Sequence, residues 1–450
     1  MISIKGIHSQ RCWIDGKFQE ATILLDNDKI KEITIGKLSN SSDYIWDVGM
    51  DVVMPGAIDV HTHINEPGRT EWEGFETATK AAAAGGLTML VDMPLNSCPV
   101  TTNVSAFNEK IKAGNRSKLY VNCGLYGGLV LDNLDDLESL IKCGILGVKC
   151  FLTPSGIDDF PNVGKEELDV AMPIIAKYNI PMLAHCELTD SPVADTNEER
   201  LPSSYRQYLE SRPRRWENEA VDLMIDLCEV HQCQTHIVHV SSSDALDNIA
   251  NAKSKGLPLT AETCPHYLYF NAENIPDSNT LYKCAPPIRE EENNQKLKVA
   301  FKSGVLDLIS SDHSPAPPEL KEIESGNLLK AWGGISGLQY LISASWTSLK
   351  GQLTLDEFIP LLTENPAKYL GIQNQKGALQ KGMDADITIW SPEESFEVKI
   401  SENQHKHKTT PYTGEMLFGK IKSTFVNGVQ VFNQIVLKKQ PGKWILKNQK

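Results

Sequence analysis

The sequence predicts an α/β protein, a TIM (β/α)8 barrel joined to a small β-sandwich domain built from both chain ends. Eight short apolar runs alternate with amphipathic helical stretches across residues 56–376. Strands that alternate with helices indicate a parallel sheet, and eight such units are typical of a TIM barrel. The segments on either side are rich in short strands instead. A doubly wound open sheet is the alternative, but no glycine-rich phosphate motif follows the first run.

The two end segments have the pattern of β-hairpins. Residues 1–55 contain CWIDGKF, ATILLDNDKI and KEITI, with Asp-Gly and Asn-Asp between the strand-like runs. Residues 377–450 contain DADITIW, SFEVKI and STFVNGVQVF, in which Asn427 and Gly428 suit a tight type I′ turn. The simplest packing places 1–55 and 377–450 in one sandwich, and residues 56–376 form the barrel.

The barrel elements follow one another along the middle of the chain. The eight predicted strands are AIDVHTH, GLTMLVDM, LYVNCGL, ILGVKCFL, IPMLAHC, THIVHVSS, PLTAETC and VLDLISSDH. Helical stretches between them include FETATKAAAAG, KEELDVAMPIIAKY, ENEAVDLMIDLCEV and SDALDNIANAKS. Their apolar residues recur with helical spacing, so one face of each helix should cover the strands.

Composition excludes several classes of partner. The chain has 450 residues, a net charge of −14 and 41% hydrophobic residues. An acidic chain lacks the basic face that nucleic acid or an anionic membrane requires. No apolar run approaches the roughly 20 residues of a membrane span. Ten scattered cysteines without a C-x-x-C pair, and no signal peptide, predict free thiols in the cytoplasm, with an organelle as the alternative.

Polar side chains occur where the predicted strands end. They are His61 and His63 (first strand), Lys149 (fourth), His185 (fifth), His239 (sixth) and Asp312 (eighth). TIM-barrel active sites lie at these carboxyl ends. A single histidine in an apolar strand is usually a packed core residue, whereas a buried lysine or aspartate without a partner is costly. Taken together, the six positions favour a functional site.

Metal binding accounts for this set of residues. Two histidines at i and i+2 with further histidines and a carboxylate suit Zn²⁺. An ammonium cannot bind a cation, but a lysine that has captured CO₂ is an anionic carbamate able to bridge two ions. A buried lysine near two dications loses its proton readily, which gives the reactive form. His236 should face the other way and pack against helices, while His266 and His313 are candidates for supporting the ligands.

The arrangement H-x-H, mid-chain Lys, two single His and late Asp resembles the binuclear cyclic amidohydrolases. This family includes dihydroorotases, hydantoinases (dihydropyrimidinases) and allantoinases. The stretches MPGAIDVHTH and KGMDADITIW extend the resemblance over nearly the whole chain. Within this family the chain resembles the allantoinase group most. The stretches that carry this resemblance are HTHINEPGRTEWEGFETATKAAAAGG, VDMPLNS, KCFLTPSGIDDFP, CPHYL, KCAPPIR and SDHSPAPP.

The resemblance implies a metal-dependent hydrolase that opens the hydantoin ring of allantoin to allantoate, in purine catabolism. It implies two zinc ions per subunit, bridged by Lys149 as N6-carboxylysine, and a homotetramer. The implied ligands are His61, His63 and Asp312 for one ion and His185 and His239 for the other. Asp312 would also carry the proton from the attacking water to the departing ring nitrogen.

Two positions separate the chain from the other ring hydrolases. Dihydroorotases carry Arg two residues after the second His, to hold a carboxylate, but Asn65 stands here and can hydrogen-bond a neutral ureide. Hydantoinases carry Tyr five residues after the bridging Lys, where this chain has Pro154. Asn96 matches a family position that contacts substrate. A turn residue remains the alternative for Asn65, and a loop cap for Asn96.

Two functional alternatives stay open, a hydantoinase-like or dihydroorotase-like ring hydrolase and a non-enzymatic scaffold on the same fold. Such scaffolds lose metal ligands, whereas all six positions are present here. The stretch AWGGISG, residues 331–337, suits close approach of backbone to a ligand. The polar insertion at 190–215 is either a lid or a surface insertion. The stretch KHKTTPYTG near residue 410 resembles a family loop without a role derived from its residues.

Overall fold

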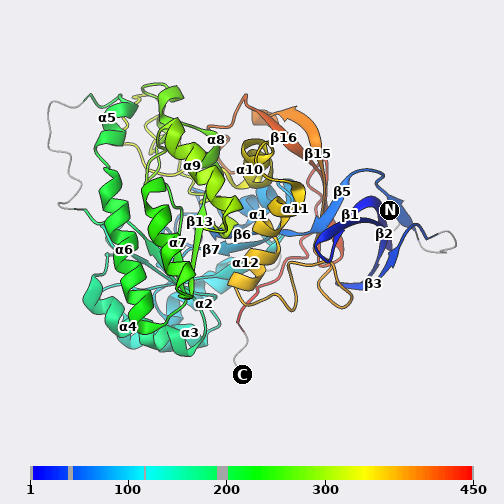
Figure 1. Cartoon of the computed structure of the whole chain (residues 1–450), viewed down its shortest axis with the longest axis horizontal. Coiled ribbons are helices and arrows are strands. Elements are labelled where there is room, and N and C mark those ends of the chain that lie inside the picture. The colour runs from blue at the N-terminus through cyan, green and yellow to red at the C-terminus, as the bar shows by residue number, and fades with distance from the viewer. Residues whose placement is uncertain (1–3, 39–43, 116–117, 190–200, 448–450) are drawn as a thin grey trace.

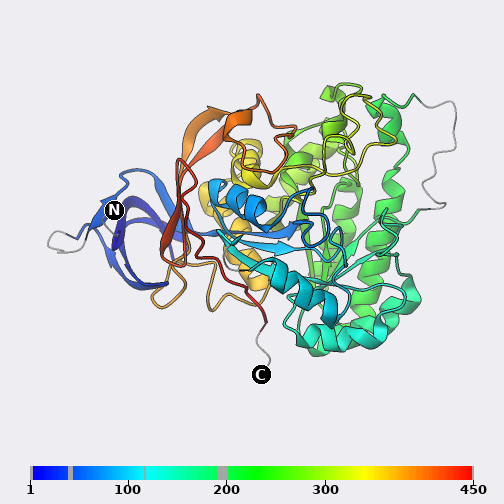
Figure 2. The ribbon, with the colours of Figure 1, turned by 180° about the vertical axis from the view of Figure 1, so that it is seen from behind.

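The computed structural model describes the chain except residues 1–3, 39–43, 116–117, 190–200 and 448–450. Figure 1 shows two parts side by side, a barrel of strands surrounded by helices and a β-sheet that carries the N-terminus. Figure 2 shows, from behind, that strands from the end of the chain lie between these two parts. The protein is therefore an α/β barrel with an attached sheet that both chain ends build.

Both chain ends contribute strands to one sheet. Its strands are β1 (Gly6–Ile14), β2 (Lys17–Asp26), β3 (Lys29–Ile35), β4 (Ile45–Asp47), β5 (Val52–Pro55), β15 (Ile387–Glu397), β16 (Met416–Val426) and β17 (Val429–Asn433). The order is β17-β16-β15-β5-β1-β2-β3, and β4 pairs with β1. The two ends meet where β15 pairs antiparallel with β5, with Ile387 opposite Pro55.

Two-residue turns join strands of this sheet. Asn427 and Gly428 lie between β16 and β17 with φ of 48° and 74°, and Asp15 and Gly16 lie between β1 and β2 with φ of 50° and 73°. Positive φ at both central residues is the type I′ geometry, which Asn-Gly and Asp-Gly tolerate. The type I′ turn predicted at Asn427 is confirmed.

Parallel strands form the barrel. They are β6 (Ala57–Thr62), β7 (Leu87–Asp92), β8 (Asn122–Leu125), β9 (Gly127–Gly128), β10 (Val148–Phe151), β11 (Met182–His185), β12 (Thr235–Ile237), β13 (Leu259–Thr263) and β14 (Leu308–Ile309). β8 and β9 are two pieces of the third strand, interrupted at Tyr126. A parallel bridge between Thr62 and His313 closes the ring, with His63 N donating to His313 O at 2.8 Å. The predicted TIM barrel is confirmed.

Helices cover the outside of the barrel (Figure 1). The α-helices are α1 (Phe75–Ala84), α2 (Val104–Ala113), α3 (Leu134–Lys142), α4 (Lys165–Lys177), α5 (Tyr205–Glu210), α6 (Arg214–His231), α7 (Leu246–Ser254), α8 (Pro265–Tyr269), α9 (Glu291–Lys302), α10 (Leu341–Leu349), α11 (Leu355–Phe358) and α12 (Glu364–Tyr369). Short 3₁₀ turns are η2 (Ser243–Ala245), η3 (Ala272–Asn274), η4 (Thr280–Tyr282), η5 (Leu338–Tyr340), η6 (Ile359–Leu362) and η7 (Ile400–Glu402).

Sequence patterns explain these elements. In α6, Ala220, Val221, Met224, Leu227 and Cys228 are buried at helical spacing, which makes one face apolar. Every residue of β6 and β7 is buried, as expected for parallel strands covered on both faces. Among the described residues, no helix combines the length and the apolar character needed to cross a lipid bilayer.

The last described residues return to the barrel. Trp444 forms a parallel bridge with Cys123 of β8. Cys123 N donates to Lys443 O at 2.9 Å, and Ile445 N donates to Cys123 O at 2.8 Å. The chain near residue 444 therefore pairs with the edge of β8 that faces away from β7.

Candidate active site

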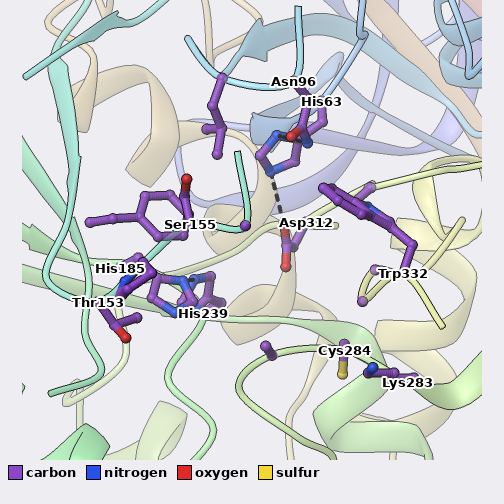
Figure 3. A pocket seen from close by; sticks show the side chains of 18 of the residues that line it. His63, Asn96, Thr153, Ser155, His185, His239, Lys283, Cys284, Asp312 and Trp332 are labelled. Atoms are coloured by element: carbon purple, nitrogen blue, oxygen red, sulfur yellow. Dashed lines mark hydrogen bonds and ion pairs between the residues drawn. The ribbon is translucent and has the colours of Figure 1, made fainter. Parts of the chain in front are cut away.

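A cavity of about 290 Å³ lies at the carboxyl ends of the barrel strands. Sites for small molecules span roughly 300–1,000 Å³, so this cavity suits a compact ligand. The structure brings all six of the predicted strand-end residues to its wall, namely His61, His63, Lys149, His185, His239 and Asp312. Figure 3 shows Asp312 in the middle, with His63 on one side and His185 and His239 on another.

His61, His63 and Asp312 form the first group of ligand atoms. Asp312 Oδ1 lies 3.2 Å from His61 Nε2 and 3.3 Å from His63 Nε2. One ligand atom from each residue lies within 4.8 Å of the other two, and all three side chains are buried. The first and eighth strands are neighbours in the closed barrel, which is why these distant residues meet. Two imidazoles and a carboxylate fit one divalent cation.

His185 and His239 form the second group. His185 Nδ1 lies 2.9 Å from His239 Nε2, and the Phe151 ring stacks on His185 with centroids 4.4 Å apart. Burial lowers the pKa of His185 and lowers that of His239 further. Both rings are therefore neutral at pH 7, and a neutral imidazole offers a lone pair to a metal. The two facing nitrogens fit a shared cation.

Lys149 completes the candidate metal centre. Its Nζ is buried and has no hydrogen-bond partner within the described part of the chain. Burial lowers the pKa of Lys149 to about 8. An unpartnered amine among neutral imidazoles and a carboxylate is costly as an isolated group. The donor set and this orphaned amine together fit a metal-binding site.

Glu262, which the sequence reasoning did not single out, fixes the first group. Its Oε1 lies 2.6 Å from His61 Nδ1. Burial alone would raise the pKa of Glu262, but His61 and His236 hold it well below its usual value, so the carboxylate is ionised. It accepts a hydrogen bond from the N–H at His61 Nδ1. The opposite nitrogen of His61 is then left as the lone pair that a metal needs.

Glu187 does the same for the second group. It accepts a hydrogen bond from His185 Nε2 at 2.9 Å and is clamped by Arg212, whose Nε and Nη2 donate at 3.2 and 2.6 Å. Burial raises the pKa of Glu187, but Arg212 and His185 outweigh it and lower the pKa to about 2. The sequence signal available for Glu187 was its position as a charged residue next to a strand end. For Glu262 the signal was a charged residue inside an apolar strand.

The expected direction of His236 is wrong, but its expected contact with a helix is confirmed. His236 Nε2 lies 3.2 Å from Glu262 Oε2, and its ring packs at a tilt against Tyr369 of α12 with ring centres 4.3 Å apart. The prediction assumed strict alternation between His236 and His239, which are three residues apart. His239 has φ of 40°, so the alternation breaks at that residue and both side chains point inward.

Of the two predicted substrate contacts, Asn96 lines the cavity and Asn65 does not. Asn96 lines the cavity, and its Nδ2 is 3.2 Å from His63 Nδ1. Asn65 is buried, its Nδ2 donates to Pro315 O at 3.4 Å, and it is absent from the described lining of the cavity. Both have φ near 67°, a left-handed conformation that Asn tolerates. A substrate role for either residue stays a prediction.

Other stretches singled out in the sequence also reach the site. Ala331 to Gly334 of the glycine-rich stretch line the cavity, and so does Pro154. Of the polar insertion, residues 190–200 lie outside the described residues, while Tyr208 and Arg212 line the cavity.

The two candidate supporting histidines are placed differently. His266 is buried, and neither of its ring nitrogens has a partner within the described chain. His313 Nε2 lies 3.3 Å from Glu73 Oε2, a carboxylate that also accepts from Lys406 N of the KHKTTPYTG stretch.

Comparison with known proteins is consistent with this site. Residues 52–431 match the model of the Amidohydrolase family. The chain is 43% identical to an allantoinase of Arabidopsis thaliana over 90% of this chain and 82% of the relative. It is 37% identical to an allantoinase of Saccharomyces cerevisiae (92% and 88% covered) and 34% identical to one of Escherichia coli (96% and 98%).

Solved structures of a hydantoinase and a dihydropyrimidinase are similar in fold to this chain. An L-hydantoinase (dihydropyrimidinase) from Arthrobacter aurescens superposes with a TM-score of 0.89 at 28% identity, covering 99% of this chain and all of that one. A dihydropyrimidinase from Brevibacillus agri gives a TM-score of 0.86 at 26% identity with the same coverage.

Proposed function

The chain belongs to the amidohydrolase family, and on that premise we propose that it opens the hydantoin ring of allantoin by hydrolysis to allantoate, in purine catabolism. One observation carries the proposal: four imidazoles, a carboxylate and an orphaned amine converge on a cavity for a compact ligand. Relatives named allantoinase, at 34–43% identity over most of the chain, support the choice of substrate.

Zinc is the proposed metal, because imidazole and carboxylate ligands suit it. His61, His63 and Asp312 would hold one ion and His185 and His239 a second, with carboxylated Lys149 shared between them. Bound there, the ions would polarise the scissile carbonyl and lower the pKa of water to roughly 7.

The carboxylation of Lys149 is supported by its surroundings. The ammonium would first lose one proton to solvent; the uncharged amine would then form a bond to the carbon of CO₂ and release a second proton, so that a cationic side chain becomes an anionic one. A pKa lowered to about 8 by burial makes the uncharged amine accessible at neutral pH. The unpartnered Nζ, which has no other use in the described chain, supports the same assignment.

Asp312 is the proposed proton carrier. Burial alone would raise the pKa of Asp312, but His61 and His63 hold it well below its usual value, so the carboxylate is ionised. It would accept a proton from the attacking water and pass it to the ring nitrogen as the carbon–nitrogen bond breaks. Asn96, on the cavity wall beside His63, would orient the ring, and Asn65 is a second proposed contact through its unpaired Oδ1.

A substrate panel tests the proposal. The purified protein, loaded with zinc in the presence of bicarbonate, is assayed with allantoin, hydantoin, dihydrouracil and dihydroorotate, and zinc content is measured. We expect kcat/KM to be highest for allantoin and activity to disappear on chelation. Faster turnover of hydantoin or dihydroorotate would favour the alternative ring hydrolases, and a chain that binds no metal would favour a scaffold.

A homotetramer and a cytoplasmic location are also proposed. Light scattering of the purified protein tests the first, since one subunit has a mass of 49.9 kDa. Cell fractionation tests the second. One relative, from Aquarana catesbeiana, is named a mitochondrial allantoinase, so the mitochondrial fraction is the comparison to include.

A further inference from the structure

We propose that Lys283, together with Arg212, forms a cationic subsite that binds the ureido arm of the substrate. This inference rests on the proposed function and assigns a residue that the ring-opening chemistry does not use. Both side chains line the cavity. In Figure 3, Lys283 lies across the cavity from His185 and His63, beyond Asp312.

Lys283 is a partly buried cation without an acidic partner in the described chain. Its Nζ donates one hydrogen bond, to Leu329 O at 3.1 Å, and lies 5.3 Å from the centre of the Tyr208 ring. An ammonium has three N–H donors, so two remain for a ligand. Burial, together with the charge of Arg212, lowers the pKa of Lys283 to about 8. A partly desolvated ammonium of this kind is stabilised when a ligand oxygen accepts from it.

Arg212 has an unused edge on the same wall. Its Nε and Nη2 hold Glu187, and no hydrogen bond from Nη1 is found within the described part of the chain. A guanidinium keeps its charge at every physiological pH. Lys283 and Arg212 therefore both offer donors here, and only Arg212 is paired with a carboxylate; Lys330, which also lines the cavity, is exposed.

The backbone around Lys283 is held in place before any ligand binds. Lys283 O accepts from Gly334 N at 2.8 Å and from Lys321 Nζ at 3.4 Å. The buried Lys321 also donates to Trp332 O at 3.0 Å and Gly334 O at 2.8 Å. Tyr208 OH donates to Cys284 O at 2.7 Å. A prearranged wall loses little conformational entropy when it binds a ligand.

The chemistry of the substrate determines which group meets this wall. The carbonyl that is attacked must lie beside Asp312 and the histidines, and it becomes the carboxylate of the product there. The ureido arm extends from the ring carbon next to that carbonyl and points away from the bond that breaks, and its own carbonyl oxygen is a neutral acceptor for N–H donors. Hydantoin has the same ring without this arm. Lys283 should therefore contribute to binding of allantoin and not to binding of hydantoin.

Lys283→Met removes the donors and keeps the length of the side chain. In the metal-loaded enzyme we expect KM for allantoin to rise about 10- to 100-fold, the usual worth of a hydrogen bond to a charged group. The kcat for allantoin, the zinc content and the inhibition constant of hydantoin should stay at the wild-type values. Lys283→Arg, which restores a charged donor, should recover most of the KM effect.

Lys298→Met is the matched control, because Lys298 is a partly buried lysine on α9 outside the described lining of the cavity. Variants of Arg212 are left aside, since they release Glu187 as well. An unchanged KM for allantoin in Lys283→Met overturns the subsite. Equal weakening of hydantoin and allantoin overturns it too. If Lys283→Met is insoluble, Lys283→Gln takes its place. A wild-type enzyme that leaves allantoin intact overturns the proposed function instead.

Discussion

Lys149→Arg should abolish the binuclear site while leaving the fold intact. The Lys149 side chain is buried on β10, and its amine has no hydrogen-bond partner in the described chain. Arginine keeps a positive charge at that place but cannot lose its proton to react with CO₂. The substitution therefore removes the proposed bridging ligand and keeps a cation beside four imidazoles.

The pKa of Lys149 explains why lysine and arginine differ at this position. It falls from 10.5 to about 8 on burial, which eases loss of the proton by about 3 kcal/mol. At pH 7.5 about a quarter of the side chain would then be uncharged, against about one part in a thousand for lysine in water. Arginine has no comparable fraction. Loss of the bridging ligand should lower turnover by roughly 10³-fold or more, equivalent to about 4 kcal/mol of transition-state stabilisation.

The assay combines metal analysis with native mass spectrometry. Wild-type protein reconstituted with zinc and bicarbonate should carry two zinc ions and the mass of one added CO₂ per chain, and Lys149→Arg should carry neither the CO₂ nor the second ion. Lys110→Arg is the control for added volume, because Lys110 is equally buried but is paired with Asp92 at 2.6 Å. Two zinc ions and normal turnover in Lys149→Arg would refute the bridging carbamate.

The other predictions concern residues around the same cavity. Asp312→Asn should lower kcat by roughly 10²-fold or more, since an amide cannot accept the proton; a near-wild-type kcat would make Asp312 a structural residue. Glu187→Gln should weaken zinc binding by about 10- to 100-fold in a metal titration, because His185 loses its ionised acceptor; unchanged affinity would contradict that role. Asn65→Arg should raise KM for allantoin without conferring dihydroorotase activity, because the added charge is desolvated with no carboxylate to pair it; unchanged kinetics would place Asn65 away from the substrate. Finally, the Lys283 ammonium, packed near Arg212, Lys321 and Tyr208, is present below pH 8 and lost above it, so KM for allantoin should rise above pH 8 in the wild type but not in Lys283→Arg; parallel profiles would contradict this.

The barrel was predictable because its signals are local. Each apolar run indicates a strand that is buried on both faces, and each amphipathic stretch indicates a helix that covers the strands. The strand-end position of His61, His63 and Lys149 followed from the same count. The inward direction of His236 did not, because alternation fails at His239, whose positive φ depends on the packing of the strand end.

Residues that act through distant partners were beyond the reach of the sequence. Glu187 is understood only once Arg212, 25 residues later, is seen to clamp it. Lys283 opens the KCAPPIR stretch that carries part of the family resemblance, but the stretch alone gave it no role, because its proposed role depends on the absence of an acidic neighbour in the described fold. Charge pairing across elements is a property of the tertiary structure, so neither role could be derived from spacing alone.

The pairing of the chain near Trp444 with β8 has a consequence for how the protein folds during synthesis. A ribosome releases the third barrel strand long before residues 443–445. The backbone N–H and C=O of Cys123 therefore lack their partners until those residues are made. The pairing of β5 with β15 waits similarly. Nascent chains stalled before residue 440 should expose unpaired strand edges, which favour aggregation and chaperone binding. Completion of this fold is therefore expected to wait until residues 443–445 have left the exit tunnel, and proteolysis of chains stalled before that point should remain fast.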